Sequence, residues 1–336
     1  MAKKAKKSPG IPSSLKSSKT SKTSKTQKIR NPDEYDSSRP LSRFDTERLN
    51  RFIAQLIKSN EVKSVEELNQ LIEEMLKHKT LDELLDSIEF NAKEKAQDLA
   101  YAALETRDKK EALWLVNEAL KLDPDCIDAL VLKTIIQAKS PSEIIETLKE
   151  IIAKAEKNFG TEYFKENKGD FWGLVETRPY MRALLALIII LRAEGRLGES
   201  ILVAEKMLKL NQNDNQGIRY FLLGLYLETG NLDGARRLFK EFPESSAVFN
   251  WGEILERYLV GDIKKAKKLL REAMSQNPYV LDYLIGKKEI PQEGIKYYSS
   301  GEESEAIMCW QEIGIAWEEY PDALKWLRSF AKEADR

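Results

Sequence analysis

The stretch YLETGNLDGARRLF, residues 226–239, contains the pattern that decides the fold: a turn residue, Gly230, followed five positions later by a small residue, Ala235. Apolar residues at helical spacing lie on both sides of this step. The small residues of the last four such steps are 35, 31 and 40 positions apart. This spacing is typical of helical repeat proteins, so we expect an all-α, right-handed solenoid. The other steps are Arg107/Ala112, Gly195/Ser200, Gly261/Ala266 and Gly301/Ala306.

The charge of the chain is divided unevenly. Residues 1–30 carry ten Lys or Arg and no Asp or Glu, and the whole chain has a net charge of −1, so the other 306 residues carry −11. Residues 1–40 are rich in Ser, Thr and Lys with almost no aliphatic side chains, which predicts a disordered tail. Two interpretations of the tail stay open: a solubilising segment, or an electrostatic arm that contacts nucleic acid or another polyanion through residues 1–30.

After the tail, residues 41–92 form a predicted helical leader and residues 93–334 the repeat domain, interrupted by an aromatic-rich insertion at 161–180. Two leader helices are predicted from capping boxes, at Ser64 with Glu67 and at Thr80 with Glu83. In the last predicted unit, one of the neighbouring residues Tyr297 and Tyr298 is expected to be buried and the other to be exposed. The predicted units lie at about 93–126, 127–160, 181–214, 216–246 and 247–280, followed by a last unit that ends near Tyr320 and by a closing helix at 322–332, with Tyr297 and Tyr298 in the first helix of the last unit.

The first unit fits a known repeat register. The tetratricopeptide pattern asks in turn for bulky, bulky, small, small, bulky, small and proline residues, and this unit has at those positions Ala96, Leu99, Ala100, Ala112, Val116, Ala119 and Pro124. Small residues let two crossing helices approach, and the proline ends the second helix because it lacks an amide hydrogen. The chain therefore resembles the tetratricopeptide repeat (TPR) proteins.

A narrower resemblance covers about residues 170–327. The motifs ETRPYMRA, NDNQGIRY, NPYVLDYLIG, GEESEA and DALKWL make this part similar to the suppression-of-tumorigenicity 7 family and its prokaryotic look-alikes. This resemblance implies an all-helical repeat fold and a scaffold role, with no catalytic residues to carry over. The animal members are membrane-associated, and the present chain departs from them because its longest apolar stretch, residues 183–191, is far shorter than the roughly 20 residues of a span. We expect this stretch to form a buried helix in the centre of the array.

The sequence offers no catalytic constellation. His78, the only histidine, lies between two lysines at a predicted helix end, and Cys126 and Cys309 stand alone without a metal-ligand spacing. There is no phosphate-binding loop and no dinucleotide-binding glycine motif. We therefore expect a cytoplasmic protein that is not an enzyme and holds no cofactor or metal, and whose partner is another protein.

The candidate partner-binding residues combine polar, cationic and aromatic side chains near the points where the repeats are irregular. Several of them also have a purely structural interpretation. The stretch ETRPY (176–180) can be a helix start, NDN (213–215) can be a turn, and Trp251 and Tyr258 can be core residues. The binding interpretation assigns them to the concave groove of the solenoid, where arginine pairs with carboxylates and stiff aromatic side chains anchor a peptide or helix. These residues are Arg178, Tyr180, Arg182, Asn215, Arg219, Trp251 and Tyr258.

Overall fold

The computed structural model describes residues 43–59, 62–78, 83, 90–291, 295 and 297–334, and these are almost entirely helical. They contain no β-strand, so the predicted all-α class is confirmed. The predicted tail, residues 1–40, and the start of the helix predicted at Thr80 lie outside the described residues. The helices are α1 (Arg43–Ser59), α2 (Val65–Leu76), α4 (Ala92–Glu105), α5 (Lys109–Leu122), α6 (Ile127–Gln137), α7 (Pro141–Glu166), α8 (Arg178–Ala193), α9 (Leu197–Leu210), α10 (Ile218–Glu228), α11 (Leu232–Glu241), α12 (Ala247–Leu259), α13 (Ile263–Gln276), α14 (Val280–Leu284), α15 (Glu303–Glu318) and α16 (Pro321–Ala334), with a 3-10 turn η1 (Val175–Thr177).

The turn-and-small-residue step has a clear structural basis. Gly195, Gly230 and Gly261 follow α8, α10 and α12 with φ of 71°, 70° and 83°, a left-handed conformation that glycine adopts without a steric penalty. Five residues later, Ser200 and Ala235 are fully buried on α9 and α11, where each second helix packs against its first. The step therefore marks the end of one helix and the closest approach of the next.

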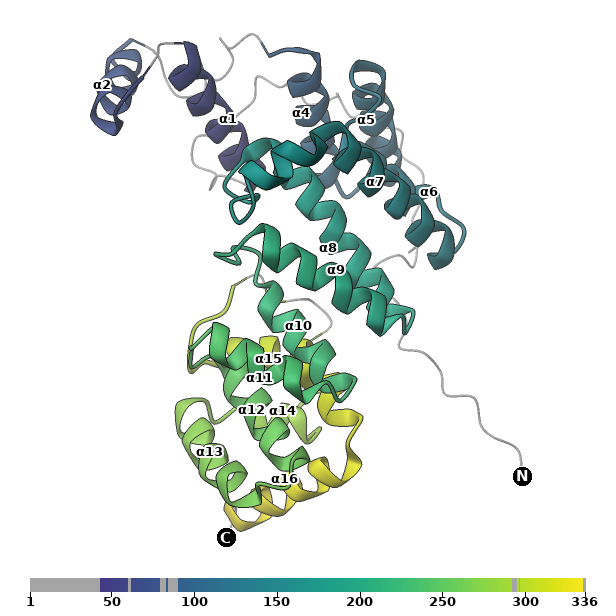
Figure 1. The fold of residues 1–336 in the computed structure, drawn as a ribbon, viewed down its shortest axis with the longest axis vertical. Coiled ribbons are helices and arrows are strands. Elements are labelled where there is room, and N and C mark those ends of the chain that lie inside the picture. The colour runs from purple at the N-terminus through teal and green to yellow at the C-terminus, as the bar shows by residue number, and fades with distance from the viewer. Residues whose placement is uncertain are drawn as a thin grey trace, which may run out of the picture.

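Helices pack mainly against their neighbours in sequence. In addition, α4 packs against α6, α6 against α8, and α10 against α12. We call the face formed by α4, α6, α8, α10 and α12 the inner face. Figure 1 shows the helix pairs following one another along the long axis of the molecule, from α4 and α5 at one end to α13 and α16 at the other.

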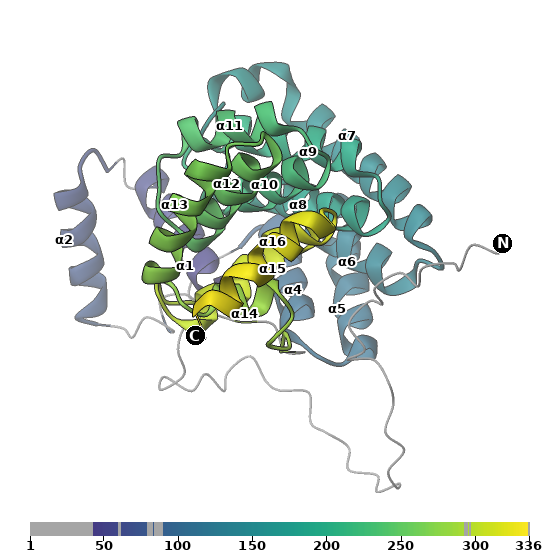
Figure 2. The same cartoon turned by 90° about the horizontal axis from the view of Figure 1, so that it is seen from below.

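Two helices of the chain lie on this inner face. Near the C-terminus, α15 turns back and packs against both α10 and α12, and Figure 2 shows it on the opposite side of them from α11. The crossing with α10 is close because Gly224 has no side chain: a Cβ there would overlap the carbonyl oxygen of Glu312. Near the N-terminus, α1 lies against α4 and the start of α8, as its hydrogen bonds show.

The apolar core is divided in a way that separates α1 from the rest. One large cluster of buried side chains runs from α6 to α16, and a smaller one joins α4, α5 and α6. The buried side chains of α1, Phe52 and Leu56, form a third cluster with α2. Among the described residues, α1 therefore buries its apolar side chains against α2 and meets α4 and α8 mainly through polar groups and the ring of Phe44.

The segment before α15 corrects one expectation. Tyr297 and Tyr298 lie outside any helix and are 89% and 46% exposed, so neither is buried and they do not form a first helix. The short α14 precedes them instead. By contrast, the predicted cap Ser64 is present, since its hydroxyl accepts the amide hydrogen of Glu67, and Ser140 caps α7 in the same way with the amide of Glu143. No helix of the described chain has the length and hydropathy to cross a membrane.

Candidate partner-binding face

The N-terminal half of the inner face is organised around Arg182 of α8. Its Nε and Nη2 donate to the two carboxylate oxygens of Asp128 on α6 at 3.0 and 2.5 Å, and its Nη1 donates to both oxygens of Glu47 on α1 at 2.7 and 2.9 Å. From α4, Gln97 donates to Asp128 at 2.7 Å and Tyr101 donates to Glu47 at 2.6 Å. Because Glu47 and Asp128 are only 2% and 4% exposed, these charges interact with little screening by water.

The surroundings of Tyr101 and Arg182 raise the pKa of both side chains, which keeps both protonated as donors to Glu47. Burial, followed by the charge of Glu47, raises the pKa of Tyr101, which keeps its hydroxyl protonated as a donor. Burial alone would lower the pKa of Arg182, but the two carboxylates raise it above its usual range. The network is therefore a fixed arrangement of donors around a carboxylate, in which Tyr101 and Arg182 both keep their protons at neutral pH.

Other contacts of α1 with the body are also polar or aromatic. The ring of Phe44 stacks on Tyr101 with centroids 4.7 Å apart. Arg51 forms an ion pair with Asp98 and donates to the carbonyl oxygen of Glu94 at 3.1 Å. These side chains lie on one face of α1, because they are separated by whole turns of the helix.

The C-terminal half of the inner face is held by a second arginine of α8. Arg192 pairs with Glu228 of α10 at 3.1 Å and donates to the backbone oxygen of Glu312 on α15, also at 3.1 Å. Its guanidinium lies over the ring of Phe221, 5.0 Å from the centroid. Burial raises the pKa of the Glu312 carboxyl to about 7, which Arg192 only partly opposes.

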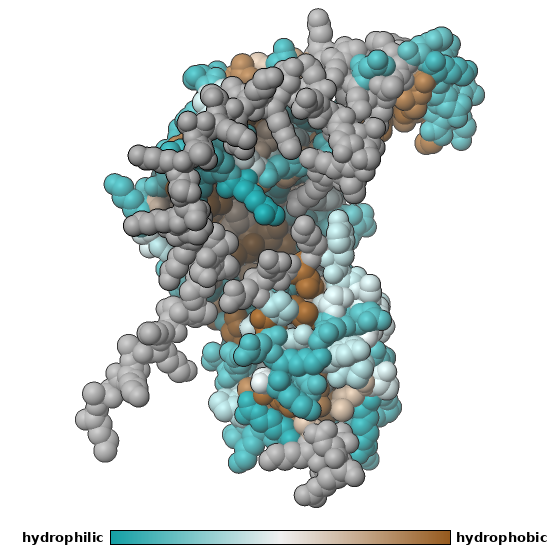
Figure 3. Space-filling view, turned by 180° about the vertical axis from the view of Figure 1, so that it is seen from behind, coloured by the Kyte–Doolittle hydropathy of each residue, from teal (hydrophilic) through white to brown (hydrophobic). Residues whose placement is uncertain are grey.

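Between these two arginines lies an apolar stretch that no described helix of the chain covers. Leu185 and Ile189 follow Arg182 at helical spacing on the same face of α8, and Ile189 is 50% exposed. Ile189 lies seven residues after Arg182. On α6, Ile135 likewise lies seven residues after Asp128, the partner of Arg182, and it is 46% exposed. Figure 3 shows apolar surface in a hollow about halfway along the molecule. Exposed apolar side chains flanked by charged pairs are typical of an interaction surface.

The structure places Tyr180 and Trp251 in the core rather than on an open surface, with 0% and 1% exposure. The hydroxyl of Tyr180 donates to Glu156 at 3.0 Å. Arg178 is partly buried and donates to the backbone oxygen of Trp172 at 2.9 Å. Tyr180 and Arg178 thus use within the chain the bonding capacity that the sequence interpretation offered to a partner, whereas the indole nitrogen of Trp251 is buried without a hydrogen-bond partner among the described residues.

The remaining predicted residues lie apart from the Arg182 network. Arg219 is held by Asp214 at 2.8 Å and by Glu244 at 3.0 Å. Asn215, in the turn before α10, is exposed. Tyr258 is half-buried and packs on Trp326 of α16 with ring centroids 5.0 Å apart. The seven predicted residues therefore do not converge on one surface, although Arg178 and Arg182 lie together beside Glu47.

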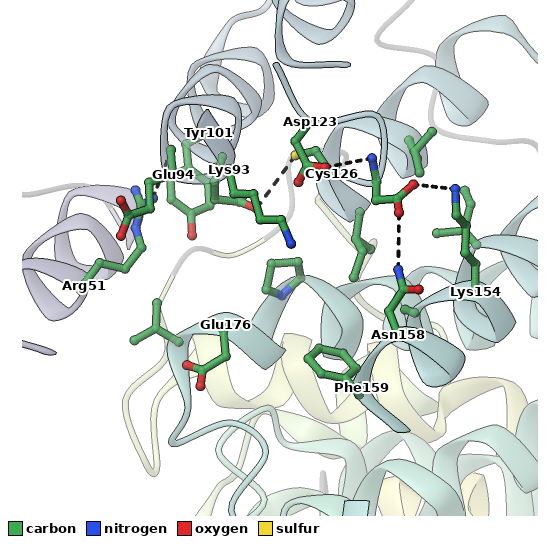
Figure 4. Close-up of a pocket in the computed structure, with 18 residues that line it drawn as sticks. Arg51, Lys93, Glu94, Tyr101, Asp123, Cys126, Lys154, Asn158, Phe159 and Glu176 are labelled. Atoms are coloured by element: carbon green, nitrogen blue, oxygen red, sulfur yellow. Dashed lines mark hydrogen bonds and ion pairs between the residues drawn. The ribbon is translucent and has the colours of Figure 1, made fainter. Parts of the chain in front are cut away.

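A cavity of about 400 Å³ lies behind α1, between α4, α6, α7 and the start of α8. Figure 4 shows Arg51 at one end and Lys154 with Asn158 at the other, and both of these last side chains bind Asp125. Its wall is largely apolar and includes Phe159. Most charged groups at its rim are paired within the chain, so the cavity is suited to an apolar side chain more than to a reaction.

The thiols have no activated environment. Burial raises the pKa of Cys126 to about 12, and its Sγ lies 3.9 Å from the side-chain oxygen of Gln97. Burial also raises the pKa of Cys309 well above its ordinary value. Both thiols are therefore protonated at neutral pH, which removes the thiolate that nucleophilic chemistry needs. Within the residues that the structure describes, no group of three His, Cys, Asp or Glu side chains could hold a metal ion.

Comparison with known proteins gives no identification. No protein-family model matches the chain, and no curated protein matches its sequence. The functional argument therefore rests on the inner face itself. Two residues of that face were not predicted from the sequence: Glu47, which lies in the predicted helical leader, and Ile189, which lies in an apolar run expected to be buried. A signal for the second was present, since Arg182, Leu185, Ile189 and Arg192 share one helical stripe.

Proposed function

We propose that the chain is a non-enzymatic adaptor, in which a TPR-like solenoid binds a helix or peptide of a partner protein on the inner face. The binding surface is the stretch between α1 and α15, centred on Ile189. The observation that carries this proposal is that the inner face holds two helices of its own chain and leaves an apolar stretch uncovered between them.

The sequential packing of helix pairs supports the repeat architecture. Left-handed glycines end the first helices of three successive pairs, and α10 packs against α12 in the way that first helices of neighbouring units do. The motifs shared with the suppression-of-tumorigenicity 7 family, such as NDNQGIRY, support the same assignment. Proteins of this architecture present extended surfaces to partners, which fits a scaffold role.

The two covering helices indicate what kind of ligand the face accepts. α15 is held by apolar packing and a close backbone crossing at Gly224, whereas α1 is held by ion pairs and one stacked ring. A face that accepts helices by both kinds of contact suits an amphipathic helix, which offers an apolar stripe flanked by charges. Arg182 and Arg192 would then border the bound helix, and Leu185 with Ile189 would contact its apolar stripe.

The proposal is tested by placing a charge in the uncovered stretch. We expect Ile189→Asp to abolish association with the partner, because a buried unpaired carboxylate costs several kcal/mol. Leu202→Asp is the matched control: Leu202 lies on the neighbouring helix α9, away from the inner face, and is 67% exposed. Both variants should keep the unfolding temperature of the wild type, since both positions are already open to solvent.

The measurement is quantitative affinity capture of the wild-type chain and both variants from the native cells. We expect at least one protein that the wild type and Leu202→Asp retain equally and that Ile189→Asp loses. If the captured proteins are the same for all three chains, the inner face is not the partner-binding surface.

A further inference from the structure

The carboxylate of Glu47 occupies a site that the rest of the chain builds without help from α1. Arg182 is oriented by its two bonds to Asp128, and Asp128 is in turn held by Gln97. This leaves Nη1 of Arg182 directed at the position of Glu47, with the hydroxyl of Tyr101 beside it. Because the donors are fixed by α4, α6 and α8, the site is preorganised for a carboxylate, which lowers the cost of binding one.

The helix that fills this site is attached to the body in an unusual way for a core element. Its buried apolar side chains, Phe52 and Leu56, belong to the cluster it shares with α2, and among the described residues that cluster is separate from those of the body. The described contacts of α1 with α4 and α8 are ion pairs, hydrogen bonds and the stacking of Phe44. A competing helix with the same groups can replace these contacts one for one, so that the buried cation of Arg182 again has a carboxylate partner after the exchange.

α1 also displays the recognition pattern. Phe44 stacks on Tyr101, Glu47 enters the carboxylate site, and Arg51 reaches Asp98. The three side chains are separated by three and four residues, so they form one stripe along the helix. An aromatic residue, a glutamate three positions later and an arginine four positions after that therefore define what the site accepts.

We propose that this site is a docking surface for a partner helix with the same aromatic–glutamate–arginine stripe, and that α1 occupies it in the free chain. The inference rests on the proposed function in assuming that a partner helix exists, but it concerns a different part of the inner face from Ile189. Release of α1 uncovers the donors on Arg182 and Tyr101 and opens the wall of the neighbouring cavity, which Arg51 lines.

Competition within the chain sets the size of the expected effect. A ligand that needs the site empty binds with an affinity reduced by the fraction of molecules in which α1 is released. Removing the Glu47 carboxylate weakens the attachment of α1 and leaves Arg182 paired with Asp128. Since a hydrogen bond between charged groups is strong, the loss should raise the released fraction by about tenfold or more.

The test uses the full chain and a fluorescent synthetic peptide of residues 43–59, with binding followed by fluorescence anisotropy. We expect the peptide to bind the Glu47→Ala chain at least about ten times more tightly than the wild-type chain. A Glu66→Ala chain is the control, because Glu66 lies exposed on α2, outside the network, and should bind as the wild type does. A peptide carrying Glu47→Gln should bind the Glu47→Ala chain at least about ten times more weakly than the wild-type peptide.

Three results would overturn the proposal: no binding of the wild-type peptide to the Glu47→Ala chain, equal binding of the two peptides, or equal binding to the Glu47→Ala and wild-type chains. A Phe44→Ala chain, which weakens α1 without unpairing a buried charge, must show the same gain if the first variant fails to fold. A concentration-dependent dimer of the wild-type chain that Glu47→Ala abolishes would assign the site to a second copy and would also contradict a partner helix. None of these results depends on Ile189, so failure here is distinguishable from failure of the proposed function.

Discussion

Replacing Gly224 by alanine should push α15 away from α10 and destabilise the fold. A Cβ at this position would lie well inside 3.0 Å of the carbonyl oxygen of Glu312, so α15 would have to withdraw by about 1 Å to reach an ordinary contact of about 3.5 Å. That movement also breaks the bond from Arg192 to the same oxygen. Overpacking costs about 1–3 kcal/mol and a lost hydrogen bond to a charged group about 1.5–3 kcal/mol, so we expect a loss of about 2–5 kcal/mol.

The assay is urea unfolding followed by tryptophan fluorescence, since Trp317 of α15 is fully buried. Gly198→Ala provides the matched control: Gly198 lies in the first turn of α9, and a Cβ there meets no atom within 4 Å. That variant should be neutral or more stable by up to about 1 kcal/mol, because alanine favours helix. Equal stability of the two variants would refute the close crossing of α10 and α15.

Three further substitutions or measurements test the charge and burial arguments. Arg182→Met should lower the free energy of unfolding by about 3–5 kcal/mol, because it leaves two buried carboxylates without their cation; a loss under about 1 kcal/mol would contradict the network. The raised pKa of Glu312, about 7 against an ordinary 4.5, means that the folded chain keeps a proton that the unfolded chain loses, so stability falls by up to about 3 kcal/mol as pH rises from about 4.5 to 7. Glu312→Gln should flatten unfolding profiles in that window, and an unchanged slope would show that the carboxyl titrates normally. Cys126 and Cys309 should resist a thiol reagent at pH 8 until urea unfolds the chain, and rapid modification of the native chain would contradict their burial.

The all-helical fold was predictable because its signals are local. Gly230 marks the end of one helix, and Ala235 marks the point where the next helix packs against it. Ser140 with Pro141 marks the start of α7. A cap or a turn glycine acts within one helical turn, so it can be read from a few adjacent residues. The same locality explains the error at Tyr297 and Tyr298, where the repeat pattern was extended into a segment that has no helix.

The candidate site was predicted only in part because its contacts join distant residues. The sequence interpretation assigned Arg182 to a partner, whereas in the structure its guanidinium binds Asp128 and Glu47, and Glu47 lies 135 positions away in the same chain. Likewise, nothing near Gly224 in the sequence indicates that the backbone of Glu312 lies against it. Ile189 was assigned to the core with the rest of its apolar run, since hydropathy alone does not distinguish the inner stripe of α8 from its buried side.

The most direct test of the account places a photo-crosslinking amino acid, benzoylphenylalanine, at Ile189 and, in a second chain, at the comparably exposed Leu202. After irradiation in the native cells, we predict a discrete crosslink to another protein from position 189 that is missing from position 202 and is lost when Leu185→Asp is added. Identical crosslinks from both positions, or none from position 189, would contradict the proposal that the uncovered inner face binds a partner.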